Sequence, residues 1–424
     1  MSERIVIKSE DIVGLIQRTL NEVDSRLVEH GLRVALLVSG MLEIDGGFTE
    51  REKQDICMLS VLHDIGAYKT EEIDRLVQFE TSDVWEHSIY GYLFLRYLSP
   101  LDEWAEAVLY HHVPYEKIPY AKAPIRKAAQ MIKLADRMEI FYRGRRKSNT
   151  AKQIWEEARE YLEKRPKGQV CDQVIQYFIE AQEKFGLFEI LKRDTIDPQI
   201  VFPKVSLSKE ERIKYLKMLT YAIDFRSQHT VTHTITTTSI SECCARYMGL
   251  SEDRIEYIRY GAMLHDLGKI GIPVEILEFP GKLSAKAMEI MRTHVDITAR
   301  ILDGAAAEEV ERIALRHHEK MDGSGYPLGL TGEDMTLDEE IVAVSDIVSA
   351  LIGTRSYKAA FSKDRTAEII GNMAKEGKLN AQIVAVMKEH FEDILGEVAE
   401  NCAPILQNYY GIQSEYRRLL VKFL

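Results

Sequence analysis

The sequence lacks the cysteine pattern and the long apolar runs that define several functional classes. Its 424 residues include five cysteines, at positions 57, 171, 243, 244 and 402, without paired metal-ligand spacing. An odd number of scattered thiols argues against a disulfide framework or a thiolate zinc site, and predicts reduced cysteines in the cytoplasm. The longest apolar stretch, "IVAVSDIVSALIG", is too short to span a bilayer and has an aspartate in its middle.

An excess of positive charge is missing as well. The chain has 55 Lys and Arg against 67 Asp and Glu, a net charge of -12. A nucleic acid polymer is therefore not an expected partner, because phosphate neutralisation needs a basic face. The net negative charge does not exclude a small anionic ligand, because a single local cationic pocket is enough to bind it. The beginning, "MSERIVIKSEDIVGL", scatters charges among short apolar pieces and predicts no signal peptide. We expect a cytoplasmic protein without a membrane segment.

Alternating strand patterns are scarce, and most of the chain has helical periodicity. Stretches such as "RIEYIRYGAMLHDL" (254–267) place apolar residues three and four apart. The pattern breaks near residues 190–207, where two prolines and β-branched residues occur. The sequence thus predicts an all-α fold with two domains, 1–200 and 201–424.

The two halves repeat one pattern of histidines and aspartates. The first half contains His30, His63, Asp64, His87, His111, His112 and Asp136. The second half contains His233, His265, Asp266, His294, His317, His318 and Asp346. Matching positions are 202 to 210 residues apart, and local context also repeats, as in "VLHDIGAYK" and "MLHDLGKIG". Five matches in one order predict an internal duplication, hence two tandem helical domains.

Ten of the 12 histidines occupy these matched positions, which favours a metal site in each half. Imidazoles combined with carboxylates suit ions of the Mn, Fe, Co or Zn type. Asp346 lies among apolar neighbours, where an ionised carboxylate is costly unless it is paired or bound to metal. A salt bridge or a helix cap remains the alternative for this aspartate.

The order of these residues resembles that of HD-domain phosphohydrolases. The second half is similar to the HD-GYP subfamily over about residues 224–375, through "HDLGKIGIP" (265–273), "HHEKMDGSGYPLG" (317–329) and "SDIVSALIGTRSYK" (345–358). Members of that subfamily are bacterial phosphodiesterases of cyclic dinucleotides. The resemblance implies hydrolysis of cyclic di-GMP in the first place, or of cyclic GMP-AMP, by a hydroxide that bridges two metal ions.

The resemblance also implies roles for individual residues. His294, His317 and His318 would bind one metal, and Asp266 would bridge to a second metal held by His233, His265 and Asp346. Iron or manganese is expected first, with zinc, cobalt and nickel as alternatives. Some members bind a third metal through a glutamate one helical turn before the first histidine. His229 takes that position here; it is either a third-metal ligand or a solvent-facing polar residue.

Several residues are expected to contact the substrate. By resemblance, Gly325, Tyr326 and Pro327 shape the substrate side of the site. Lys269 is placed to touch the phosphate or to assist the leaving oxygen, so Asp266 and Lys269 are the catalytic candidates. Arg355 and Lys358 are candidates for clamping the other phosphate oxygens. Solvated helix faces are the alternative for these cations.

The first half keeps the metal-ligand pattern but loses other parts of the motif. Ala67 replaces the lysine after the HD pair, and no glycine-rich loop follows the histidine pair. We therefore expect a regulatory or structural HD module, with or without metal. For the whole chain, a phosphohydrolase of mononucleotides and a non-catalytic dinucleotide receptor are the alternative functions. The sequence leaves open whether the chain forms a homo-oligomer.

Overall fold

The computed structural model describes residues 6–22, 25–67, 85–118, 121–193, 195–224, 231–279, 281–353 and 361–423. Within these ranges the chain forms helices and no strand, apart from isolated β-bridges between Ile7 and Ala306 and between Asp322 and Thr331. The predicted all-α class is confirmed. Among the described helices, none is both long and apolar enough to cross a membrane.

The chain divides into two compact units that do not follow chain order. Residues 1–23 join residues 208–411, and we call this the C-terminal unit. Residues 24–207 join residues 412–424, and we call this the N-terminal unit. The functional division into domains 1–200 and 201–424 stays a prediction.

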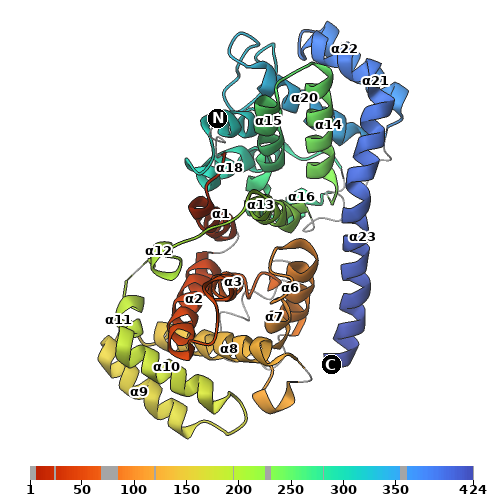
Figure 1. Ribbon diagram of the computed structural model, residues 1–424. Coiled ribbons are helices and arrows are strands. Elements are labelled where there is room, and N and C mark those ends of the chain that lie inside the picture. Colours follow the sequence, from red (N-terminus) through yellow and green to blue (C-terminus); the bar gives the residue numbers. More distant parts are fainter. Residues whose placement is uncertain are drawn as a thin grey trace. The chain divides into compact units, whose positions relative to one another are not determined.

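The C-terminal unit is built around three helices that pack against one another, α14 (His233–Tyr247), α15 (Glu252–Leu264) and α20 (Leu337–Ile352) (Figure 1). Its other elements are α1 (Ser9–Asn21), α13 (Lys209–Asp224), η2 (Leu267–Gly271), α16 (Val274–Leu277), α17 (Ala285–Arg292), α18 (His294–Leu302), α19 (Glu308–Leu315), α21 (Lys363–Lys375), α22 (Ala381–Glu389) and most of α23 (Phe391–Phe423). A capping box between Thr336 and Glu339 starts α20, because each side chain accepts a hydrogen bond from the other residue's backbone N–H.

The N-terminal unit repeats this plan with α2 (Ser25–Asp45), α3 (Glu50–Val61) and α8 (Ala123–Arg143), where α2 packs on both α3 and α8 (Figure 1). Its other elements are α6 (Trp85–Leu98), α7 (Glu106–Tyr110), η1 (Tyr115–Lys117), α9 (Ala151–Lys164), α10 (Asp172–Phe185), α11 (Leu187–Leu191) and α12 (Pro198–Val201). The capping box of Thr49 and Glu52 starts α3.

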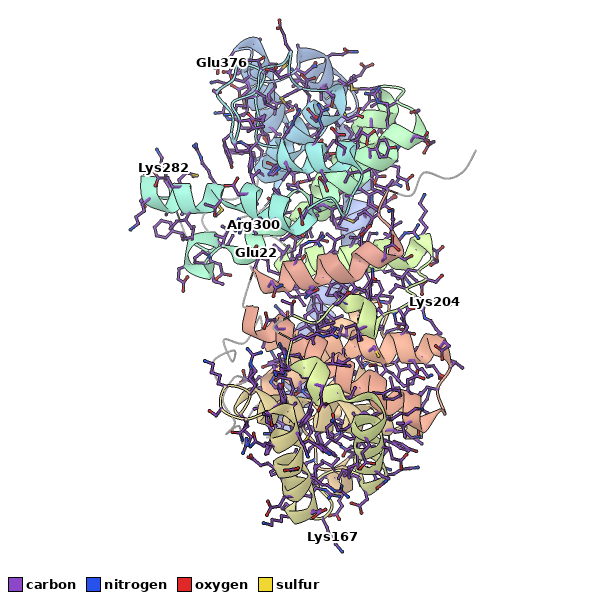
Figure 2. The ribbon with its side chains drawn as sticks, turned by 90° about the vertical axis from the view of Figure 1, so that its left-hand side faces the viewer. Glu22, Lys167, Lys204, Lys282, Arg300 and Glu376 are labelled. Atoms are coloured by element: carbon purple, nitrogen blue, oxygen red, sulfur yellow. The ribbon has the colours of Figure 1, made fainter. Side chains whose placement is uncertain are left out.

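Helix α1 is an unexpected part of the C-terminal unit. It packs on η2, which directly follows Asp266, and on α18, which begins at His294. Arg18 donates hydrogen bonds to the carbonyl oxygens of Ile301 (2.5 Å) and Leu302 (3.0 Å) at the end of α18. Glu22 and Arg300 form an ion pair at 2.8 Å, and Figure 2 shows these two side chains together. Helix α1 and the residue that follows it therefore hold α18 in place.

Replacing Arg18 with alanine is expected to destabilise the C-terminal unit by about 1.5–3 kcal/mol, because two charge-assisted hydrogen bonds to helix-end carbonyls are lost. Hydrogen exchange of the α18 amides, combined with thermal unfolding, measures the change. The control is Lys8→Ala, since Lys8 contributes only an exposed ion pair with Glu10 at 3.8 Å. Equal exchange rates in the two variants would show that the contact of Arg18 does not hold α18.

Candidate active site

The His265-Asp266 pair lies where α15 ends and η2 begins. Gly268 allows η2 to lie directly against α18, because a Cβ atom there would come within 1.9 Å of the His294 carbonyl oxygen. The Gly268 N–H donates to the hydroxyl of Thr298 on α18 at 2.9 Å. This close approach brings the HD pair beside His294, the first residue of α18.

The carboxylate of Asp266 lies between two groups of histidines. Its Oδ2 is 3.3 Å from Nε2 of His233 and 3.1 Å from Nε2 of His265. Its Oδ1 is 3.6 Å from Nε2 of His294 and 3.8 Å from Nε2 of His317. Each oxygen thus faces one group, so the carboxylate could contact a cation held by either group of histidines.

Asp346, on α20, completes both groups. Its Oδ1 is 3.2 Å from Nε2 of His233, and its Oδ2 is 3.6 Å from Nδ1 of His318. Candidate ligand atoms within each of the sets His233, His265, Asp266 and His294, His317, His318 lie within 4.8 Å of one another. The structure therefore brings together seven of the predicted metal ligands.

Hydrogen bonds to the outer ring nitrogens fix how the imidazoles face. Nδ1 of His265, His294 and His317 lies 2.6–2.7 Å from the carbonyl oxygen three residues earlier in the chain. A carbonyl only accepts, so each Nδ1 carries a proton and each ring turns its Nε2 toward the site. His233 contacts Ser349 instead, with Nδ1 3.1 Å from the hydroxyl oxygen.

The donor set fits divalent metal ions. Nε2 of His233, Nε2 of His265 and Oδ1 of Asp266 are buried and have no hydrogen-bond partner among the described residues. Burial lowers the pKa of His318 to about 3, so this imidazole is neutral and able to coordinate. Burial also lowers the pKa of His265, but Asp266 and Asp346 outweigh it and raise that pKa to about 10. The buried carboxylates of Asp266 and Asp346 thus favour positive charge at the centre of the site.

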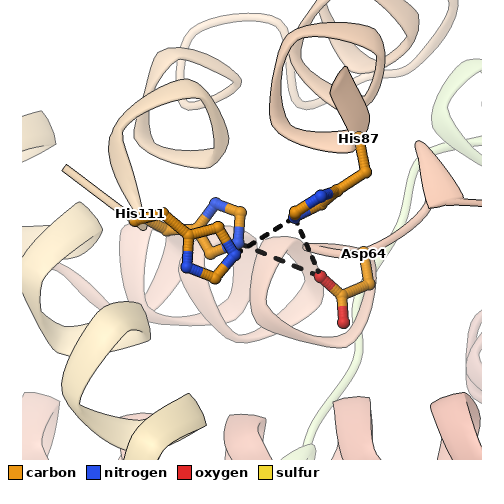
Figure 3. Close-up of side chains that lie close together, drawn as sticks. Asp64, His87 and His111 are labelled. Carbon is orange, nitrogen blue, oxygen red and sulfur yellow. Dashed lines mark hydrogen bonds and ion pairs between the residues drawn. The ribbon is translucent and has the colours of Figure 1, made fainter. Parts of the chain in front are cut away.

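The N-terminal unit contains a second cluster with the same arrangement. Asp64 Oδ1 is 3.6 Å from Nε2 of His87 and 3.9 Å from Nε2 of His111 (Figure 3). Its Oδ2 is 3.4 Å from Nε2 of His63. The candidate ligand groups are Asp64, His87, His111, His112 and His30, His63, Asp136. All seven residues predicted from the first half are therefore brought together.

Comparison with protein families assigns both clusters to one kind of domain. A family model described as HD domain matches residues 27–140, and a second model with the same description matches residues 217–383. The chain contains two HD domains. Its two HD domains lie in tandem, which confirms the predicted duplication of the fold.

Several characterised proteins are similar to this HD chain. A 3'3'-cGAMP-specific phosphodiesterase of Vibrio cholerae is 26% identical over 394 residues, 88% of this chain and 89% of the relative. A cyclic di-GMP phosphodiesterase of Thermotoga maritima is 40% identical over 146 residues, 34% of this chain and 40% of the relative. A cyclic di-GMP phosphodiesterase response regulator of Xanthomonas campestris is 38% identical over 174 residues, 40% of this chain and 46% of the relative. The chain thus spans less than half of the latter two.

One solved structure shares the fold over most of the HD chain. The crystal structure of a cyclic GMP-AMP-specific phosphodiesterase of V. cholerae superposes with a TM-score of 0.53, at 17% sequence identity. The match covers 91% of this chain and 98% of that chain. This likeness supports the fold.

The loop after the histidine pair of the second HD domain forms one wall of the site. The Tyr326 ring lies 4.6 Å from the His318 ring, centroid to centroid, and the Arg292 guanidinium lies 4.7 Å from the Tyr326 ring. Gly325 passes so close to the backbone of Glu319 that a Cβ atom would come within 2.5 Å of it. Pro327 follows through a cis peptide bond.

Of the four remaining predicted site residues, the structure describes Lys269 and not the other three. Lys269, in η2, forms an ion pair with Asp266 at the edge of the metal-ligand cluster. His229, Arg355 and Lys358 lie outside the described residues.

Glu319 is a site residue that the sequence interpretation missed. Its buried carboxylate accepts hydrogen bonds from the backbone N–H groups of Leu328 (2.7 Å) and Leu330 (3.0 Å), and so fixes the glycine-rich loop. An acidic residue a few positions before a glycine-rich loop was the available signal. Ser349 and Glu339 were missed as well, because their partners lie on other helices.

Replacing Glu319 with glutamine is expected to raise KM for a substrate held by this loop about tenfold, with a smaller effect on kcat. A glutamine side chain has one carbonyl oxygen for two N–H donors, so one buried donor loses its partner, at a cost of about 1–3 kcal/mol. Steady-state kinetics separate the two parameters. Glu333→Gln, at an exposed position of the same segment, is the control. A fall in kcat alone would contradict a loop-positioning role.

Proposed function

We propose that the C-terminal unit is a metal-dependent phosphodiesterase that hydrolyses a cyclic dinucleotide. The observation that carries this proposal is the position of Asp266, with one oxygen toward each group of inward-facing imidazoles. Two cations about 3.5–4 Å apart, bridged in this way, are typical of enzymes that cleave phosphate esters.

Cyclic di-GMP is the first substrate candidate, and 3'3'-cGAMP is the second. The relatives named for cyclic di-GMP match a shorter part of this chain at higher identity, whereas the relative named for 3'3'-cGAMP matches nearly the whole chain. Both ligands are dianionic and carry two purine bases. The Tyr326 ring and the Arg292 guanidinium beside it are the groups that would contact a purine base next to the ligand cluster.

The chain's own residues have separable roles in this proposal. The two metal ions, when bound, would supply an activated water and offset the charge on the phosphoryl oxygens. Lys269 would donate to a phosphoryl or leaving oxygen, because its ammonium lies at the Asp266 carboxylate. Arg355 and Lys358 remain the proposed contacts of the second phosphate. The Glu319-fixed loop would position the substrate against the ligand cluster.

Iron or manganese is the metal we propose, with zinc, cobalt or nickel as substitutes, because neutral imidazoles and carboxylates accept all of these ions. A third ion near His229 stays a prediction. We also propose that the protein acts in the cytoplasm, since its thiols are unpaired and its substrate class is an intracellular messenger.

A substrate panel tests the proposal. Protein loaded with Mn(II), or anaerobically with Fe(II), is incubated with cyclic di-GMP, 3'3'-cGAMP and a set of nucleoside mono- and triphosphates, and products are separated by chromatography. We expect linear dinucleotide or mononucleotide products from at least one cyclic dinucleotide. If only mononucleotides are cleaved, the proposal is wrong and the protein is a nucleotide phosphohydrolase. If a cyclic dinucleotide binds tightly and is not hydrolysed, the proposal is wrong and the protein is a non-catalytic receptor.

A further inference from the structure

The N-terminal unit contains a cavity lined by arginines that the proposed hydrolysis does not use. It has a volume of about 160 Å³, and its lining consists of Glu29, His30, Arg33, Glu139, Arg143 and Arg146. We propose that this cavity binds the phosphate group of a small ligand. The proposal does not depend on hydrolysis by the C-terminal unit, since every residue of this lining belongs to the N-terminal unit.

The cavity lies beside the histidine and aspartate cluster and not at its centre. Among the described residues that line the cavity, His30 is the one member of that cluster. Nε2 of His30 lies 3.2 Å from Asp136 within the cluster, whereas its Nδ1 lies 2.7 Å from Glu139 at the cavity. A ligand in the cavity would therefore meet the outer side of the His30 ring.

Arg33, on α2, is a fixed wall of the cavity. Its side chain is buried, and its guanidinium donates hydrogen bonds to the carbonyl oxygens of Leu191 (2.6 Å) and Arg193 (2.9 Å). These two contacts hold the planar group in one orientation, so little side-chain freedom is left to lose when an anion binds. A guanidinium held in this way suits the recognition of phosphate oxygens.

The other two arginines come from the end of α8 and the turn that follows it. Arg143 is the last residue of α8, and the backbone N–H of Arg146 donates to the Tyr142 carbonyl oxygen at 2.9 Å. This hydrogen bond holds the turn against the helix. Arg33 and Arg146 therefore reach one cavity from two separate parts of the N-terminal unit.

The buried carboxylate of Glu139 is already offset by its neighbours. Its Oε2 lies 2.7 Å from Nδ1 of His30 and 3.6 Å from Nε of Arg143. Both contacts place a positive or hydrogen-bond-donating group at the same oxygen. Glu139 therefore does not by itself cancel the charge of the remaining arginines.

Arg33 and Arg146 then share one cavity with the exposed carboxylate of Glu29. Burial lowers the pKa of Arg33, the charge of Glu139 raises it, and the positive charge of Arg146 lowers it further. The two guanidinium groups are thus close enough to repel each other. An anion placed between them would replace this repulsion by attraction to both, which is the usual arrangement for a phosphate held by arginines.

Arg145 contrasts with its neighbour Arg146. It takes the position in the first half that Arg355 takes in the second. Its Nε donates to the Glu157 carboxylate at 2.8 Å, and its guanidinium lies 3.6 Å from the centre of the Phe141 ring. The residue that matches a proposed phosphate contact is therefore engaged elsewhere, and the cavity contains Arg146 instead.

The volume of the cavity favours a small ligand. Pockets that enclose drug-sized molecules have volumes of about 300–1,000 Å³, so this cavity is too small for a whole cyclic dinucleotide. It suits inorganic phosphate, or the phosphate of a monoester whose remaining atoms stay outside. A phosphate monoester is also the group that hydrolysis of a phosphodiester creates, which makes a nucleoside monophosphate a suitable probe.

Isothermal titration calorimetry of the full-length protein in chloride buffer tests the proposal. Inorganic phosphate and guanosine 5'-monophosphate are the two titrants, and we expect saturable binding of at least one. Arg146→Gln should weaken this binding about 10–100-fold, because a charge-assisted contact is lost. Arg145→Gln, the same change at the adjacent residue, should leave it unchanged.

The two titrants also distinguish the sources of the phosphate group. Tighter binding of inorganic phosphate would assign the cavity to the free ion, and tighter binding of the monophosphate would assign it to an ester. Either result supports the proposal if Arg146→Gln weakens the binding. Binding that Asp266→Asn removes and Arg146→Gln leaves unchanged would belong to the C-terminal cluster and would overturn the proposal.

Glu29→Gln gives a test that misfolding cannot imitate. Removing this exposed negative charge from the cavity should tighten phosphate binding about 3–10-fold, because its repulsion of the anion is lost. Glu52→Gln, an exposed glutamate of α3, is the control. No saturable binding of either titrant below about 10 mM, or binding that Glu29→Gln does not strengthen, would show that the cavity is not a phosphate site.

Discussion

Asp266→Asn is expected to remove hydrolysis of the cyclic dinucleotide almost completely. The amide offers one oxygen and no negative charge, so it cannot face both histidine groups as the carboxylate does. Loss of this carboxylate would remove the stabilisation that bound metal supplies, worth several kcal/mol, which corresponds to about a 10⁴-fold lower kcat/KM at 1.36 kcal/mol per tenfold. Initial rates measured by chromatography, with metal content determined on the same sample, give both quantities.

The matched control is Asp296→Asn, which makes the same chemical change at an exposed position of α18. Its rate and its metal content should equal those of the unaltered chain. If Asp266→Asn kept its rate while its metal content fell, hydrolysis would not depend on the cluster, and the assignment of the site would be wrong.

Glu339→Ala is expected to give the largest loss of stability, about 3 kcal/mol for the C-terminal unit. The buried carboxylate accepts hydrogen bonds from Arg312 (3.0 Å) and Arg316 (3.1 Å), and it also caps α20 through the Thr336 N–H (3.0 Å). Arg316 directly precedes His317, and α20 carries Asp346. The same change should therefore also weaken metal binding on both sides of the cluster.

Two further variants separate the contributions of Glu339. Glu339→Gln keeps an acceptor for the cap but loses the charge, so its loss of stability should lie between those of alanine and the unaltered chain. Glu309→Gln, on the exposed face of α19, should have almost no effect. Urea denaturation and metal titration measure the series. If the alanine variant were as stable as the unaltered chain, Glu339 would not be the residue that holds α19 and α20 together.

The sequence predicted which histidines and aspartates lie close together, because the information is local and repeated. His265 and Asp266 are adjacent, His317 and His318 are adjacent, and the same order recurs about 200 residues earlier. The all-α class followed from helical periodicity. The division of ligands between two ions came from resemblance and stays a prediction; what the structure adds is that the two oxygens of Asp266 face different groups of histidines.

Contacts between distant segments could not be predicted in this way. Arg18 lies 283 residues from its partner Ile301, and no local pattern indicates that α1 belongs to the C-terminal unit. Glu139 and Ser349 follow their aspartates by three residues in each half, yet their role as partners of His30 and His233 depends on packing between helices. Residues that support a site residue in this way can be identified only when the structure shows which helices pack beside each other.

The most direct test of the account is a time course of cyclic di-GMP and 3'3'-cGAMP consumption before and after metal is restored to metal-depleted protein. We expect no product before addition, and steady formation of linear product after anaerobic addition of Fe(II) or Mn(II), absent in His265→Ala. Hydrolysis that continues without metal, or none of either nucleotide with metal confirmed at the C-terminal cluster, would contradict a metal-dependent phosphodiesterase.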